Sequence, residues 1–113
     1  MDINFFKKTR ILDGGMGQEL LARGMKPNGT LWSANAVVNP DYHKLLLDTH
    51  LDFIKAGAEV IVTATFTTRR NRLRDNNVED KFEYLNKKAG EIAIEVKKKI
   101  PRRFNCCGIT ASK

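Results

Sequence analysis

Apolar residues recur at intervals of three and four positions along residues 39–57, which predicts an amphipathic helix with one buried face. The repeating positions are Tyr42, Leu45, Leu46, Thr49, Phe53 and Ile54. Asn39 or Asp41 can cap the first turn of this helix, and Gly57 is expected to end it. A second pattern with the same period begins at Val78 and predicts another long helix. Its buried positions would be Val78, Phe82, Leu85, Ala89, Ile92, Ala93 and Val96.

Between these two helices the pattern changes to a nearly continuous run of apolar and β-branched residues, EVIVTATF, at residues 59–66. Such a run is typical of a parallel strand that is covered on both faces. Ile11 and Leu12 form a shorter apolar run that ends in Asp13 and a glycine-rich turn, and they predict a second buried strand. The alternation of strands and helices favours an α/β fold built from βα units with a parallel sheet.

The segments between these elements carry weaker patterns. Residues 17–24 predict a short helix with Gly24 just past its end. Residues 25–39 predict a loop, because Pro, Asn and Gly follow one another near its start, and Trp32 is expected to anchor that loop. Four arginines that follow the predicted strand at residues 59–66 are interpreted as a solvated loop. They are Arg69, Arg70, Arg72 and Arg74.

Composition and charge exclude several classes of function. With 42% hydrophobic and 29% charged residues, the 113-residue chain reads as one globular domain or a piece of a larger one. No apolar run approaches the length of a membrane span and no signal peptide is evident, so neither membrane association nor secretion is expected. Two cysteines without a secretory signal fit a cytoplasmic protein. Residues 97–113 hold six basic and no acidic residues, and hence six of the seven net positive charges, so no nucleic-acid-binding face is expected.

The first candidate site is the turn DGGMG at residues 13–17. A dinucleotide-binding turn would need a third glycine where Leu20 stands, and a P-loop would need a lysine followed by Ser or Thr. Two interpretations remain. One is a plain turn between a strand and a helix. The other is a ligand site, because Asp13 follows a strand at the edge where α/β proteins collect ligand-binding groups, and glycine N–H groups there can meet a substrate carboxylate.

The second candidate site is TATFTT at residues 63–68, at the carboxyl end of the other predicted strand. Its hydroxyl groups and the Phe66 ring would face the same rim as Asp13, although threonines are also common at strand ends for their β propensity alone. His43 and His50 lie seven positions apart on the first long helix. They are interpreted as packing or surface residues, because no third metal ligand accompanies them.

The segments ILDGGMGQELLARG and LWSANAVVNPDYHKLLLDTHLDFIKAGAEVIVTATFTT, together with their spacing, resemble the N-terminal part of the homocysteine S-methyltransferase family. That family includes betaine-homocysteine methyltransferase and the homocysteine-binding domain of cobalamin-dependent methionine synthase. The resemblance covers residues 10–100 and combines the DGGMGQEL opening, the LWS loop, the AGAEVI segment and the TATF strand end.

The resemblance implies that residues 1–100 are the N-terminal portion of a (β/α)8 TIM barrel that transfers a methyl group from a donor to homocysteine. In intact relatives a zinc ion held by three cysteine thiolates binds the homocysteine sulfur and keeps it as a thiolate. The positions that match the homocysteine site are Asp13, Gly14, Thr63 and Phe66. Further matching positions, to which a mainly structural role is assigned, are Gly15, Gly17, Glu19 and His50. The resemblance assigns no catalytic residue and no metal ligand to this chain.

Residues 101–113 form an atypical basic tail that departs from the family pattern. Cys106 and Cys107 imitate the family's paired zinc cysteines, but that pair comes from much later strands, so the zinc role is not carried over. Two adjacent cysteines cannot complete a tetrahedral shell, and a disulfide between them would be strained. Read one base later, the codons possible for residues 104–112 can encode an apolar strand and a Gly–Pro turn. This favours the hypothesis that the tail is the third strand of the barrel translated in a shifted reading frame. The coding nucleotides would test it.

Together these observations predict the N-terminal fragment of a homocysteine S-methyltransferase-type enzyme. The fragment is expected to be inactive alone and marginally stable, because eight strands must close to bury a barrel core. The alternative is a small non-enzymatic α/β binding module whose basic tail contacts an acidic partner, and removal of residues 97–113 would separate the two. A further alternative is an enzyme with the same opening that methylates a different thiol or a selenol.

Overall fold

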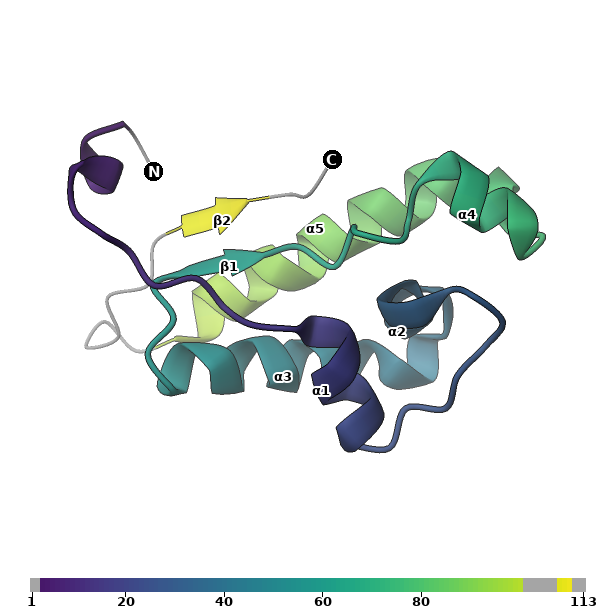
Figure 1. Ribbon diagram of the computed structural model, residues 1–113, viewed down its shortest axis with the longest axis horizontal. Coiled ribbons are helices and arrows are strands. Elements are labelled where there is room, and N and C mark those ends of the chain that lie inside the picture. The colour runs from purple at the N-terminus through teal and green to yellow at the C-terminus, as the bar shows by residue number, and fades with distance from the viewer. Residues whose placement is uncertain (1–2, 101–107, 111–113) are drawn as a thin grey trace.

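The computed structural model of the chain describes residues 3–100 and 108–110, and it consists of helices packed on a short parallel sheet (Figure 1). The short 3-10 turns are labelled η and the α-helices α. In chain order the elements are η1 (Ile3–Lys7), α1 (Met16–Ala22), η2 (Trp32–Ala34), α2 (Asn35–Val38), η3 (Pro40–Tyr42), α3 (His43–Lys55), β1 (Val60–Val62), α4 (Arg70–Asp75), η4 (Glu79–Lys81), α5 (Phe82–Lys99) and β2 (Gly108–Thr110).

Both long helices predicted from the apolar pattern are confirmed as α3 and α5. The Asn39 side chain accepts a hydrogen bond from the Asp41 backbone N–H, and Pro40 occupies the first position of η3, which leads directly into α3. Gly57 follows the end of α3 with a φ of +122°, a conformation that glycine adopts without steric cost. The predicted positions Leu85, Ala89, Ile92, Ala93 and Val96 are buried in α5, whereas Val78 precedes the helix and, like Phe82, is only partly buried.

The short helix predicted at residues 17–24 is confirmed as α1, with its boundaries moved by one or two residues. Gly24 has a φ of +104°, and its N–H donates to the carbonyl of Leu21. The N–H of Met25 donates to the carbonyl of Leu20. These two hydrogen bonds form the Schellman motif, which explains why a glycine ends the helix and directs the chain into the following loop.

The strands pair in parallel, as the alternation of elements predicts. β1 pairs with β2 in the register Val60 to Gly108, and Leu12 forms an isolated parallel bridge to Val60 on the other edge of β1. The strand is shorter than the predicted range 59–66, because the chain turns after Val62. The Val62 N–H donates to the Asp13 carboxylate, at 3.1 Å, instead of to a neighbouring strand.

The prediction that Ile11 and Leu12 form a buried strand is wrong for the described residues. Their side chains are 59% and 55% exposed, respectively. The backbone of Ile11 accepts hydrogen bonds from Glu59 and Val60, so one edge of the segment is paired. Apolar runs signal burial only when other elements cover them, and none of the elements described for this chain covers these two side chains.

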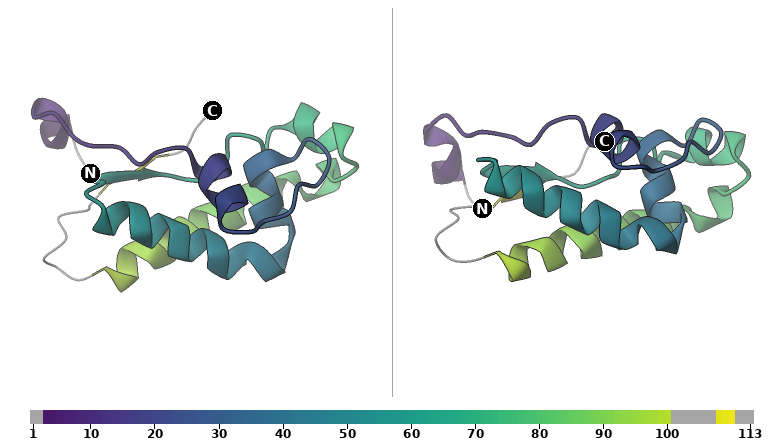
Figure 2. Two further views of the ribbon diagram at one scale, coloured as in Figure 1. Left: turned by 60° about the horizontal axis from the view of Figure 1, so that its bottom comes forward. Right: turned by 90° about the horizontal axis from the view of Figure 1, so that it is seen from below.

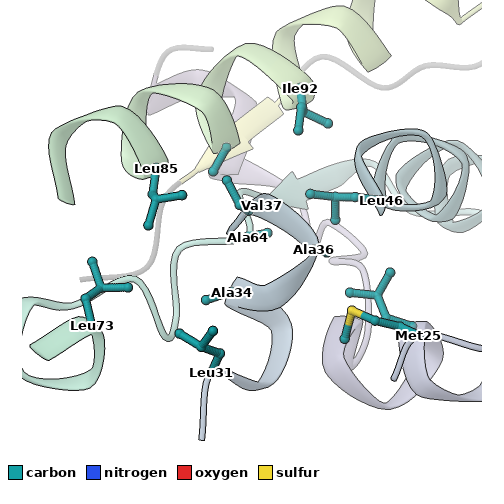
Figure 3. Packing of buried hydrophobic residues seen from close by; sticks show 12 residues of the cluster. Met25, Leu31, Ala34, Ala36, Val37, Leu46, Ala64, Leu73, Leu85 and Ile92 are labelled. Carbon is teal, nitrogen blue, oxygen red and sulfur yellow. The ribbon is translucent and has the colours of Figure 1, made fainter. Parts of the chain in front are cut away.

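The hydrophobic core lies between the helices and β1. α3 and α5 lie side by side against one face of the sheet, as Figure 2 shows. Where the two helices meet β1, a cluster of buried side chains packs together: Ile54, Ile61, Ala93 and Val96. A larger cluster at the other end joins α1, α2, α3, α4 and α5. Its side chains, which include Leu31, Leu46, Leu73 and Leu85, converge in Figure 3.

Two segments predicted as loops contain helices. Residues 25–39 include α2, whose Ala36 and Val37 are fully buried, and the four arginines lie in or beside α4, whose Leu73 is fully buried. These helices are too short to show a period in the sequence, and tertiary packing stabilises them. The arginines also have protein partners: the Arg72 guanidinium donates to the Thr30 carbonyl at 2.9 Å.

No helix within the described ranges is both long enough and apolar enough to cross a membrane. Residues 101–107 and 111–113, including both cysteines, lie outside the described residues. The hypotheses about the basic tail and its reading frame therefore stay predictions.

Candidate functional site

A pocket of about 340 Å³ lies at the carboxyl ends of the two strand segments that precede Asp13 and Thr63. Three stretches far apart in the sequence form its wall: residues 12–18, residues 32–33, and residues 62–64 with Phe66. All four residues that the sequence matched to a homocysteine site therefore line one pocket. Those residues are Asp13, Gly14, Thr63 and Phe66.

Asp13 has a half-buried carboxylate that is fixed to the neighbouring strand. Its Oδ2 accepts a hydrogen bond from the Val62 N–H at 3.1 Å, and its own N–H donates to the Val60 carbonyl at 3.1 Å. Burial raises the pKa of Asp13 above its ordinary value, and hydrogen bonds from the Val62 and Asp13 backbone N–H groups oppose that rise. The carboxylate is thus held in one place on the pocket wall.

The part of the pocket wall that follows β1 combines a buried hydroxyl with an exposed ring. Thr63 is 7% exposed, and its hydroxyl lies 3.0 Å from the hydroxyl of Thr65. Phe66 is 58% exposed, and the Arg69 guanidinium lies 5.1 Å from the centre of its ring. A large apolar ring with this much exposure beside a pocket can contact a ligand that enters it.

Trp32 forms a third part of the wall, although it is not among the site residues that the sequence predicts. A Cβ atom at Gly17 would overlap the indole of Trp32, so the absence of a side chain at Gly17 lets the indole lie against α1. Trp32 has a φ of +55° and is 39% exposed. The one sequence signal for a role of Trp32 was the LWS segment, which is part of the family resemblance.

The last two threonines of TATFTT do not line the pocket. Thr67 and Thr68 are 2% and 1% exposed. The Thr67 hydroxyl donates to the Leu31 carbonyl at 2.6 Å, whereas the Thr68 hydroxyl donates to the Asn86 side-chain oxygen at 2.7 Å. Both residues therefore connect the end of β1 to other parts of the fold.

Among the residues that the structure describes, no three His, Cys, Asp or Glu side chains lie close enough together to hold a metal ion. The zinc that the resemblance implies therefore does not fit the described part of this chain. His50 is fully buried on α3, and within the described residues neither of its ring nitrogens has a hydrogen-bond partner. Burial lowers the pKa of His50 to about 4, so the ring is neutral at pH 7.

The strands, helices and pocket define an α/β protein with a ligand-sized pocket at the carboxyl ends of parallel strand segments. The family described as homocysteine S-methyltransferase matches residues 10–112. The chain therefore belongs to the homocysteine S-methyltransferase family.

Two curated relatives and one solved structure illustrate the similarity. Homocysteine S-methyltransferase 2 of Arabidopsis thaliana is 30% identical over 113 residues, which cover 96% of this chain and 32% of that protein. Selenocysteine Se-methyltransferase of Brassica oleracea var. italica is 35% identical over 89 residues, which cover 77% of this chain and 25% of that protein. The crystal structure of the homocysteine methyltransferase MmuM from Escherichia coli, in its metallated form, superposes with a TM-score of 0.79 at 28% identity. That match covers 96% of this chain and 39% of that chain.

The chain thus spans between a quarter and a third of the length of these two curated relatives. The match to MmuM extends through nearly the whole chain, so the described elements correspond in arrangement to a part of a homocysteine methyltransferase.

Proposed function

We propose that this chain is the N-terminal part of a (β/α)8 barrel and supplies one side of a homocysteine-binding pocket to a longer methyltransferase. The observation that carries the proposal is that the four matching residues, from two segments far apart in the sequence, line a single pocket. The family to which the chain belongs supports the reaction class, transfer of a methyl group to homocysteine. Residues 1–100 would form the barrel portion, and residues 101–113 would form the atypical tail.

The pocket has groups that suit each part of a zwitterionic amino acid with an apolar, sulfur-containing side chain. The Asp13 carboxylate can accept hydrogen bonds from the ligand's ammonium group, and such charge-assisted bonds are short and strong. Gly14 and Gly15 expose their backbone on the wall, where N–H groups can meet the ligand carboxylate. Trp32 and Phe66 supply apolar surface for the methylene groups of the side chain.

In the longer protein a zinc ion would keep the homocysteine sulfur as a thiolate, with ligands from outside the described residues. The groups that this chain contributes act on the rest of the ligand. Asp13 holds and orients the amino group, Thr63 offers a hydroxyl to a polar atom of the ligand, and the two aromatic rings exclude water from its side chain. We accordingly assign binding to these residues and no catalytic role.

The proposal is tested by titrating the 113-residue chain with L-homocysteine and following the fluorescence of Trp32, the only tryptophan. We expect a saturable change with a Kd of about 1 mM, corresponding to about 4 kcal/mol, because this chain provides only part of the contacts. L-Alanine, which lacks the sulfur-containing side chain, is the matched control and should give no saturable change. A flat titration with homocysteine would contradict the proposed site.

Catalysis is tested separately by incubating the chain with homocysteine, a sulfonium methyl donor and zinc. We expect no methionine to form. Turnover by the isolated chain would contradict the proposal that the activity belongs to a longer protein.

Replacement of Asp13 by asparagine is expected to weaken homocysteine binding by about tenfold to a hundredfold, the range for loss of a charged hydrogen-bond partner. The amide oxygen can still accept the hydrogen bond from the Val62 N–H, so the fold should be retained. Far-UV circular dichroism checks the fold, and the Trp32 titration measures the affinity. Unchanged affinity in the folded Asp13→Asn variant would contradict the role of the carboxylate.

A selenol is a second candidate acceptor, because one relative with 35% identity is named selenocysteine Se-methyltransferase. The same titration with L-selenocysteine under reducing conditions distinguishes the acceptors, since the ligand with the lower Kd identifies the better fit.

A further inference from the structure

The hydroxyl group of Thr67 connects the two aromatic sides of the pocket without touching its interior. It donates a hydrogen bond to the Leu31 carbonyl at 2.6 Å and accepts one from the Ala34 N–H at 3.0 Å. The Ser33 hydroxyl lies 3.4 Å away. Thr67 directly follows Phe66, whereas its partners flank Trp32, with Leu31 before it and Ser33 and Ala34 after it. One buried oxygen atom therefore joins the segments that carry the two aromatic residues.

Trp32 needs such support, because its backbone has a φ of +55°. This left-handed conformation is unfavourable for a residue with a side chain, and it persists only where the surrounding structure enforces it. The Ala34 N–H also donates to the Leu31 carbonyl at 3.0 Å, which closes the turn locally. The Thr67 hydroxyl engages both of these groups and thereby fixes that turn to the end of β1.

We propose that Thr67 is a positioning residue that holds Trp32 against α1 and so sets the distance between the Trp32 and Phe66 sides of the pocket. The inference goes beyond the proposed function, because it concerns the shape of the pocket before any ligand binds. Only its consequence for homocysteine affinity rests on the proposed function.

Thr68 provides a matched control in the next position. It has the same side chain, is equally buried, and also donates a hydrogen bond from its hydroxyl. Its partners are the Asn86 side chain on α5 and the Thr65 carbonyl, at 2.7 and 3.2 Å, and the Asn86 amide donates back to the Thr68 carbonyl at 3.1 Å. Replacement of either threonine by valine removes a buried hydroxyl at constant shape, but only the change at Thr67 affects the segment that carries Trp32.

The experiment compares the Thr67→Val, Thr67→Ser and Thr68→Val variants of the 113-residue chain by acrylamide quenching of Trp32 fluorescence. In Thr67→Val we expect the quenching constant to rise about two- to threefold, because the indole would move from 39% exposure toward full exposure. The emission maximum should shift to longer wavelength. Thr67→Ser, which keeps the hydroxyl, and Thr68→Val should both quench like the unmodified chain.

Each outcome bears on the inference. Equal quenching in Thr67→Val and the unmodified chain would overturn it, and so would equally raised quenching in both valine variants. If Thr67→Val loses its helical circular dichroism, Thr67→Ser decides: normal quenching supports the role of the hydroxyl, and raised quenching overturns it.

A homocysteine titration of the same variants separates this inference from the proposed function. If quenching follows the expected pattern but homocysteine does not perturb Trp32 in any variant, the positioning role of Thr67 stands and the proposed ligand is wrong. If homocysteine binds the unmodified chain and Thr67→Val alike, despite increased exposure of Trp32, the inferred effect on affinity is wrong.

Discussion

Replacement of Gly17 by alanine is expected to displace Trp32 and remove most of the homocysteine affinity of the pocket. A Cβ atom at this position would overlap the indole nitrogen and its neighbouring ring atoms, so the ring must move or α1 must shift. Overpacking of this kind typically costs about 1–3 kcal/mol, and the ring that is displaced forms part of the pocket wall. We expect a loss of affinity of at least about tenfold, equivalent to about 1.4 kcal/mol, measured by isothermal titration calorimetry.

Gly90 on α5 offers the control for this prediction, because it is not among the residues that line the pocket. A Cβ atom at Gly90 would meet no heavy atom within 4 Å. Gly90→Ala should therefore fold and bind like the unmodified chain, while Gly17→Ala also shows a red-shifted Trp32 emission. Equal binding by both variants would show that the close approach of Trp32 to α1 does not shape the pocket.

The elements that could be predicted from the sequence are those specified by local interactions. The apolar period of α5, the Asn39 cap before α3, and the glycines that follow α1 and α3 all act within a few residues of where they stand. Parallel pairing was also predictable, because strands separated by a helix of this length usually pair in parallel. The closed barrel stays a proposal for the longer protein.

The errors arose where distant residues decide the structure. Ala36 and Val37 lie in a helical turn because their side chains pack in the larger core cluster. The arginine-rich segment is helical because Leu73 packs in that same cluster. Both segments are too short to display a helical period, so the apolar pattern of the sequence could not predict either helix. Ile11 and Leu12 have the composition of a buried strand, but the elements described here leave their side chains exposed.

The candidate site shows the same division. Asp13 and Thr63 could be placed at one rim because both follow predicted parallel strands, and the structure brings them to one pocket. The approach of Trp32 to Gly17 and the link from Thr67 to Leu31 join residues far apart in the chain. Contacts between residues far apart in the chain do not appear in the local sequence pattern, so they could be found only from the structure.

The stability of the chain is expected to fall steeply in mild acid because of His50. The imidazole is fully buried, and its pKa is lowered from 6.5 to about 4 by burial. In the unfolded chain the ring has its ordinary pKa, so between pH 6.5 and pH 4 the unfolded state binds a proton that the folded state does not. The free energy of unfolding should therefore decrease as the pH falls through this window, by about 3 kcal/mol in total, and His50 should contribute no further change below pH 4.

A His50→Leu variant isolates this effect. Leucine cannot be protonated, and it removes two buried nitrogens that have no hydrogen-bond partner among the described residues, each of which costs about 1–3 kcal/mol when left unpaired. Urea unfolding followed by circular dichroism should show that the variant is at least as stable at pH 7 and loses about 3 kcal/mol less between pH 7 and pH 4. His43→Leu is the control, since it leaves His50 in place and should keep the acid-induced loss. The same pH dependence in His50→Leu and the unmodified chain would place the acid sensitivity on other groups and contradict the assignment to the buried imidazole.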